Sequence, residues 1–164
     1  MPTAARGLGA KFPVGRFALA ATCVAVDAAT KAWAGRALAG RATVWVVRPW
    51  LSLELVHNRG GTLGFGAGDP LLWTLVAAAA VPFLVMMLAR SRAGLAGAAL
   101  LLGGAAGNLL SRLVAGSVTD FVHLWPWPGV FNAADVFLRV GALLVIVALL
   151  REGKWNAEGA SRSC

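Results

Sequence analysis

The sequence contains no tyrosine, only two cysteines and only seven acidic residues among 164. Cys23 lies in an apolar stretch and Cys164 is the final residue, so their positions suit neither a disulfide framework nor a cysteine-ligated metal site. Charged residues make up 13% of the chain, about half of their usual share in a globular domain. So little charge argues against a soluble globular protein.

The charge that is present is mostly positive, with 15 lysines and arginines and a formal net charge of +8. These residues are scattered between apolar runs and form no Lys/Arg block, so we expect no nucleic-acid partner. The chain has no Gly-rich phosphate loop, no metal-ligand cluster and no serine nucleophile motif. We therefore expect no cofactor and no metal.

Apolar residues dominate instead, at 59% of the chain, with a mean hydropathy of +0.73. A helix needs about 20 apolar residues to cross a bilayer. The sequence predicts an all-α membrane protein, a single domain over residues 1–164, with four transmembrane helices at about 17–34, 71–89, 93–113 and 133–150. The third includes Gly103-Gly104-Ala105-Ala106-Gly107, small residues that let helices approach closely in lipid.

The first apolar stretch matches two other kinds of segment poorly. A cleaved signal peptide would not tolerate Asp27 and Lys31 inside its apolar region. A lipidation site at Cys23 would need a leucine three positions earlier, where the chain has Ala20. A membrane-spanning helix is the better interpretation.

Residues 35–69, between the first two predicted helices, resemble strands. Thr43 to Val47 is β-branched and aromatic, and Leu51 to Leu55 alternates apolar with polar residues. Asn58-Arg59-Gly60-Gly61 then forms a predicted turn. We expect a small extracytoplasmic β-sheet element at the membrane surface.

The loop after the third predicted helix carries Trp125 and Trp127, which are predicted interface anchors. Basic residues indicate the orientation, because cytoplasmic loops are enriched in lysine and arginine. This rule predicts cytoplasmic termini, with a modest bias. One side of a four-helix arrangement carries Arg6, Lys11, Arg16, Arg90, Arg92, Arg151, Lys154 and Arg162, and the other carries Arg36, Arg41, Arg48 and Arg59.

Two aspartates, Asp120 and Asp135, lie at the outer ends of predicted membrane spans, fifteen positions apart. A charged residue inside a membrane helix costs about 2.5 to 3.5 kcal/mol on insertion scales. Such a residue is a functional hypothesis by default. Two neighbouring carboxylates cannot both ionise easily, so one keeps a proton. This is the arrangement that an aspartic hydrolase uses to activate water.

Other polar residues cluster around these aspartates in the sequence. Asp27 and Lys31 are four positions apart on one helix face, which favours a structural ion pair over direct catalysis. Asn108 and Arg112 also share a face, and Asn132 lies one helical turn before Asp135. Further candidates come from the turn after the strands: Asn58 for substrate contact, and His57, which we expect to be a surface residue.

Together these fragments resemble the lipoprotein signal peptidases, also called signal peptidase II, over residues 17 to 150. That family has the blocks Asp-x-x-Thr-Lys, Asn-x-Gly, Gly-Asn-x-x-Asp-Arg followed by Val-x-Asp-Phe, and Phe-Asn-x-Ala-Asp. Matching segments occur here in that order, beginning at Asp27, Asn58, Gly107, Val118 and Phe131.

The resemblance implies a membrane aspartic peptidase of the bacterial inner membrane. Its substrate would be a diacylglyceryl-modified prolipoprotein, cleaved just before the lipidated cysteine, and we expect a monomer in contact with membrane lipid. The active site would lie near the extracytoplasmic face and both termini in the cytoplasm. The implied roles are catalysis for Asp120 and Asp135, substrate binding for Asn58, Asn108, Arg112 and Asn132, and support of the fold for Asp27 and Lys31.

Two departures from the family pattern leave alternatives open. Ser111 stands where the pattern has an aspartate, which we interpret as the loss of a charge that supports Arg112. Gly60 is followed by Gly61-Thr62-Leu63 instead of Ala-Ala-Phe. A divergent or non-catalytic paralogue serving as a membrane scaffold is one alternative. A small transporter is another, although both aspartates are predicted at one membrane face and transport sites lie near the midplane.

Overall fold

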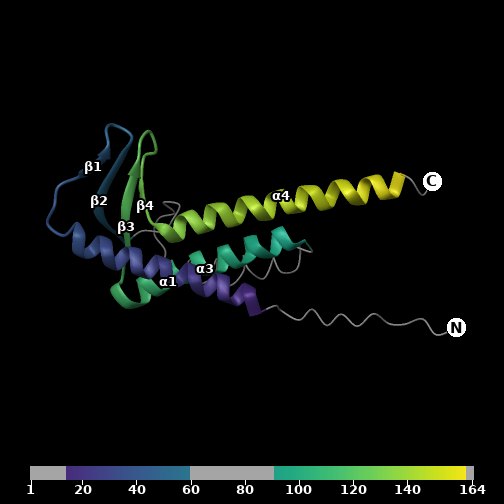
Figure 1. Cartoon of the computed structure of the whole chain (residues 1–164), viewed down its shortest axis with the longest axis horizontal. Coiled ribbons are helices and arrows are strands. Elements are labelled where there is room, and N and C mark those ends of the chain that lie inside the picture. Colours follow the sequence, from purple (N-terminus) through teal and green to yellow (C-terminus); the bar gives the residue numbers. More distant parts are fainter. Residues whose placement is uncertain (1–13, 60–90, 162–164) are drawn as a thin grey trace.

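The computed structural model describes residues 14–59 and 91–161, which form three long helices and one small sheet (Figure 1). The sheet lies at one end of the helices (Figure 1). The helices are α1 (Val14–Ala37), α3 (Arg92–Ala115) and α4 (Ala133–Ser161). The strands are β1 (Val44–Val47), β2 (Leu51–Asn58), β3 (Val118–Leu124) and β4 (Val130–Phe131).

Three of the four predicted spans are confirmed as helices of sufficient length and apolarity to cross a membrane: Phe17–Ala37, Ala93–Ala115 and Ala133–Arg151. Helix α4 continues to Ser161, beyond its predicted end near residue 150. The predicted span at 71–89 lies outside the described residues.

The chain on either side of that predicted span lies at opposite ends of the helices. Asn58 pairs with Val118, shortly after α3 ends. Arg92 begins α3, and a helix of 24 residues is about 36 Å long. Helices α1 and α3 therefore both run toward the sheet, and α4 runs away from it (Figure 1).

Small residues let the three helices approach closely, as the sequence predicts. A Cβ atom added to Gly103 would lie 2.8 Å from the Ala20 carbonyl oxygen in α1. At the next position of α3, a Cβ atom at Gly104 would lie 2.6 Å from the Ala134 carbonyl oxygen in α4. Glycine at these positions brings α1 and α4 against adjacent faces of α3, with their polar residues in reach of one another.

We expect Gly107→Ala to destabilise the fold by about 1–3 kcal/mol, the usual cost of overpacking. Its added Cβ atom would lie 2.6 Å from Oδ2 of Asp27. Thermal unfolding in detergent measures the effect. Gly35→Ala is the matched control, because nothing lies within 4 Å of its added Cβ atom. Equal stability of the two variants would contradict close packing at Gly107.

The sheet is antiparallel with strand order β1-β2-β3-β4. The strands predicted within 35–69 are confirmed as β1 and β2, but the expectation that the sheet is confined to this segment is wrong. Strands β3 and β4 come from the connection between α3 and α4, where we predicted only a loop. Val118 to Leu124 forms a strand because β2 supplies its hydrogen-bonding partner, and the sequence does not display that pairing.

The sheet is held on α1 by a small apolar core. Phe121 of β3 packs with Ala34 and with Leu38, which follows α1. Trp33 makes an edge-on ring contact with Phe121, with centroids 6.2 Å apart. This core determines where β3 lies against the helices.

Tryptophans lie in the turns between β1 and β2 and between β3 and β4. Trp50 and Trp125 are in edge-on contact, with centroids 5.1 Å apart, and the Trp125 N–H donates to the Trp50 carbonyl at 2.9 Å. Trp50, Trp125 and Trp127 are each more than half exposed. Their exposure suits the predicted role of Trp125 and Trp127 as interface anchors.

Candidate active site

The N-terminus of α4 places Asp135 by a reciprocal capping arrangement. The Asn132 side-chain Oδ1 accepts from the Asp135 N–H at 3.1 Å, and Oδ2 of Asp135 accepts from the Asn132 N–H at 3.2 Å. An N-cap residue and a carboxylate three positions later satisfy each other's backbone donors in this way. The one-turn spacing of Asn132 and Asp135 in the sequence thus corresponds to two hydrogen bonds that hold Asp135 in place.

Asp120 reaches the site from β3, so its predicted place at the end of a membrane span is wrong. It is 3% exposed, and both of its carboxylate oxygens accept hydrogen bonds. Asn132 Nδ2 donates to Oδ1 at 2.6 Å, and Asn58 Nδ2 donates to Oδ2 at 3.1 Å. Asn58 is a diagonal neighbour of Asp120, because Asp120 pairs with Val56 in the β2–β3 register.

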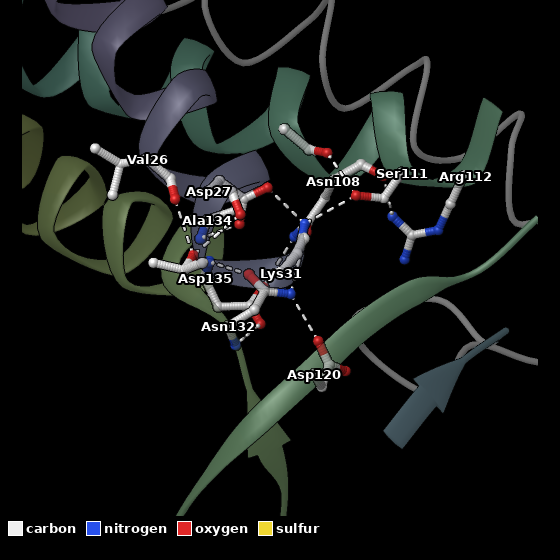
Figure 2. A network of polar contacts seen from close by, with 12 residues as sticks. Val26, Asp27, Lys31, Asn108, Ser111, Arg112, Asp120, Asn132, Ala134 and Asp135 are labelled. Carbon is white, nitrogen blue, oxygen red and sulfur yellow. Dashed lines mark hydrogen bonds and ion pairs between the residues drawn. The ribbon is translucent and has the colours of Figure 1, made fainter. Parts of the chain in front are cut away.

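Asn108 of α3 joins the two aspartates into one network (Figure 2). Its Nδ2 donates to Oδ1 of Asp135 at 3.0 Å, and its Oδ1 accepts from Asn132 Nδ2 at 3.2 Å. Because Asn132 also donates to Asp120, two asparagines bridge the carboxylates, one from α3 and one that caps α4.

The predicted ion pair of Asp27 and Lys31 is confirmed, with Nζ 2.6 Å from Oδ2 and both side chains buried. The pair also belongs to the network around the aspartates. Asp27 Oδ1 accepts from the Ala134 N–H at 3.0 Å, in the first turn of α4. The positive end of the helix dipole stabilises a carboxylate at this position. Lys31 Nζ donates to Asn108 Oδ1 at 2.8 Å. The pair therefore connects α1 to both other helices.

Burial raises the pKa of Asp120, and the hydrogen bonds from Asn58 and Asn132 lower it by less. The negative charge of Asp135 raises this pKa further, against a lowering contribution from Lys31. A carboxyl group with a raised pKa keeps its proton closer to neutral pH. This is the property that a carboxylate pair needs to act as both acid and base.

Ser111, which stands where the family pattern has an aspartate, contacts α1. Its hydroxyl accepts from Lys31 Nζ at 3.0 Å and donates to the Gly107 carbonyl at 2.9 Å. Arg112 Nη1 instead donates to the Asn108 carbonyl at 3.5 Å. Lys31 on α1 and Ser111 on α3, 80 positions apart, therefore meet through a contact that the sequence alone does not show.

The structure brings together the predicted site residues, and Ser111 joins them. Helix α1 contributes Asp27 and Lys31, the sheet contributes Asp120, and the remainder lie on α3 or at the start of α4 (Figure 2). Asn58 also comes from the sheet, at the end of β2. His57 is exposed, as expected of a surface residue. Gly60 to Leu63 lie outside the described residues.

The chain matches the family model described as signal peptidase (SPase) II over residues 19–151. A lipoprotein signal peptidase of Syntrophomonas wolfei is 35% identical over 140 residues, covering 84% of this chain and 93% of the relative. The lipoprotein signal peptidase of Bifidobacterium adolescentis is 36% identical over 139 residues, covering 80% of this chain and 73% of the relative.

Solved structures support the fold independently. A bacterial membrane enzyme determined by the in meso method at 2.3 Å resolution superposes with a TM-score of 0.72 at 24% identity, covering 87% of this chain and 91% of the other. A second, at 1.9 Å resolution, gives a TM-score of 0.68, also at 24% identity, with coverages of 85% and 94%. The helices and sheet thus form the fold of a multi-pass membrane enzyme.

Proposed function

The chain belongs to the signal peptidase II family, and from that premise we propose that Asp120 and Asp135 are its catalytic dyad. The protein is a membrane peptidase that processes prolipoproteins. We infer that it removes the signal peptide from diacylglyceryl-modified substrates just before the lipidated cysteine. The observation that carries the aspartic mechanism is the asparagine network that joins two carboxylates from a strand and a helix.

The hydrogen bonds around the dyad favour Asp120 as the protonated member. Asp135 accepts from a backbone N–H, which cannot reverse its direction, and from Asn108 Nδ2. Asp120 accepts from the side-chain amides of Asn132 and Asn58; the Asn132 amide is held in place because its Oδ1 accepts from the Asp135 N–H, but the Asn58 amide can present either an N–H or an oxygen. The raised pKa of Asp120 points the same way. Asp135 would then be the general base.

In the proposed reaction, Asp135 takes a proton from water while the water oxygen bonds to the scissile carbonyl carbon. The carbonyl π electrons move to oxygen, which takes the proton of Asp120 and forms a tetrahedral diol. The C–N bond then breaks, its electron pair goes to nitrogen, and nitrogen receives the proton held by Asp135. A diol proton returns to Asp120, which restores the starting dyad.

The remaining polar side chains have supporting roles in this proposal. Asn108 and Asn132 hold the dyad, and Asn58 contacts Asp120 from the sheet. Arg112, at the end of α3, is placed to bind substrate backbone near the dyad. Asp27 and Lys31 support this arrangement, and we propose that the enzyme works as a monomer within membrane lipid.

We propose that the enzyme crosses the bacterial inner membrane four times, with its sheet and dyad at the extracytoplasmic face. Asn58 and Arg92 lie at opposite ends of the helices, as a further crossing at 71–89 requires. Arg92 and Arg151 lie at the end away from the sheet. Arg112 and Arg139 add to the basic residues toward the sheet end, so the charge bias alone is weak support.

Cysteine labelling tests this orientation in a variant without Cys23 and Cys164. Val46→Cys, on β1, should react with a membrane-impermeant maleimide in spheroplasts, because its site is 54% exposed on the sheet. Arg151→Cys, at the other end of the helices, is the matched control and should react only after permeabilisation. The reverse pattern would place the sheet in the cytoplasm.

A purified-enzyme assay tests the function itself. We expect cleavage of a diacylglyceryl-modified lipobox peptide immediately before the modified cysteine, identified by mass spectrometry of both products. The same peptide without the diacylglyceryl group is the control and should be cleaved far more slowly. Absence of cleavage by folded enzyme would favour the scaffold or transporter alternatives.

A further inference from the structure

The Lys31 ammonium, next to the dyad, uses all of its hydrogen-bond donors. An ammonium group has three N–H donors. Those of Lys31 reach Asp27 Oδ2 at 2.6 Å, Asn108 Oδ1 at 2.8 Å and Ser111 Oγ at 3.0 Å. Only one of these acceptors, Asp27, carries a charge. The buried ammonium is therefore balanced by a single carboxylate, and its third acceptor is a neutral hydroxyl.

Lys31 also sets the direction of the hydrogen bonds that reach the dyad. Because an ammonium can only donate, the amide oxygen of Asn108 must face Lys31. The Asn108 Nδ2 group then faces Asp135 and donates to it at 3.0 Å. One side-chain amide thus separates the ammonium from a catalytic carboxylate, and the buried setting screens their interaction poorly.

The Ser111 hydroxyl has a fixed role in this arrangement. Its proton is donated to the Gly107 carbonyl at 2.9 Å, so its oxygen is left to accept from Lys31. Ser111 therefore completes the coordination of Lys31 without changing the charge of the cluster. A carboxylate at this position would complete it equally well and would add one negative charge.

We propose that Ser111 is a positioning residue that sets the pH range of catalysis by leaving the Lys31 ammonium balanced by Asp27 alone. With a neutral side chain at 111, the positive charge of Lys31 favours the ionised form of Asp120 in the neighbouring dyad. The enzyme consequently reaches its active protonation state at lower pH than it would with a carboxylate at this position. This inference rests on the proposed dyad of Asp120 and Asp135.

The other charged groups in the described part of the chain do not replace this effect. Arg112 lies on the same helix as Ser111 and is present whichever side chain occupies position 111. On the sheet, Glu54 lies near His123 and His57 is exposed. Arg139 of α4 stacks on Trp127 and Phe131. These groups are the same in every variant at position 111. A carboxylate introduced there therefore changes the charge next to Lys31 and nothing else.

The test compares Ser111→Asp with Ser111→Asn, a pair of equal shape that differs in charge. Turnover of the diacylglyceryl-modified lipobox peptide is measured against pH in a detergent with an uncharged headgroup. We expect both limbs of the Ser111→Asp profile to lie at higher pH than those of Ser111→Asn, by on the order of half a pH unit or more. The two limbs of the Ser111→Asn profile should lie at the same pH as those of the unsubstituted enzyme, whatever the turnover of the variant.

Coincident profiles for the two variants, or a shift of Ser111→Asp to lower pH, would overturn the inference. A merely structural role for Ser111 would lower turnover at every pH and leave the limbs in place. If Ser111→Asp does not fold, Ser111→Glu carries the same charge and is compared with Ser111→Gln. An error in the proposed dyad is recognised by a separate measurement. If Asp120 and Asp135 are not the catalytic pair, Asp120→Asn or Asp135→Asn retains turnover.

Discussion

Asp120→Asn and Asp135→Asn should each reduce turnover of the lipid-modified peptide on the order of 10⁴-fold or more. Asparagine keeps the shape of aspartate but can neither take a proton from water nor supply one to the substrate. The double variant should be little worse than either single variant, because the pair acts as a unit. The rate is measured in detergent and normalised to folded enzyme.

Glu54→Gln is the matched control for the dyad variants. It makes the same change from acid to amide on the same sheet, where Glu54 lies 3.9 Å from His123, away from the network of the dyad. We expect its turnover to stay within about twofold of the unsubstituted enzyme, as for most surface substitutions. Substantial turnover in either dyad variant would contradict the aspartic mechanism. The transporter and scaffold hypotheses would then have to be considered again.

Asp27→Ala should unfold the enzyme at a much lower temperature, with a loss of about 3–5 kcal/mol. The substitution leaves the buried Lys31 ammonium without its carboxylate, and it removes the acceptor of the Ala134 N–H. Without these two interactions α1 is held less firmly against the neighbouring helices. Thermal unfolding in detergent and the amount of folded protein in membranes measure the effect.

Asp27→Ala combined with Lys31→Met distinguishes the ion pair from packing. Replacing both partners of a buried pair costs less than removing one, since no uncompensated charge remains. The double variant should therefore recover part of the stability, although not the contact with Ala134. A double variant less stable than Asp27→Ala would contradict the electrostatic explanation.

The local parts of the site could be predicted from the sequence. The spacing of Asp27 and Lys31, one helical turn apart, is sufficient for their ion pair. The spacing of Asn132 and Asp135 likewise leads to the hydrogen bonds at the start of α4. Both arrangements depend only on helix geometry, which neighbouring residues in the chain determine.

The non-local parts could not be predicted in this way. The sequence predicts Asp120 at the outer end of a membrane span, whereas it lies on a strand that exists only through pairing with β2. In the sequence Ser111 stands beside Arg112, whereas in the structure its hydroxyl meets Lys31 on another helix. Each of these contacts joins segments that are far apart in the chain.

The sequence by itself determined the membrane class, three helices confirmed within the described residues, and the family, because apolar length and motif order are properties of consecutive residues. The tertiary structure decided how the two aspartates share one network, through Asn108 and Asn132 from different helices. It also decided that Lys31 meets Ser111. Close approach at glycines such as Gly103 and Gly107 is the physical reason, since it allows side chains of separate helices to form hydrogen bonds.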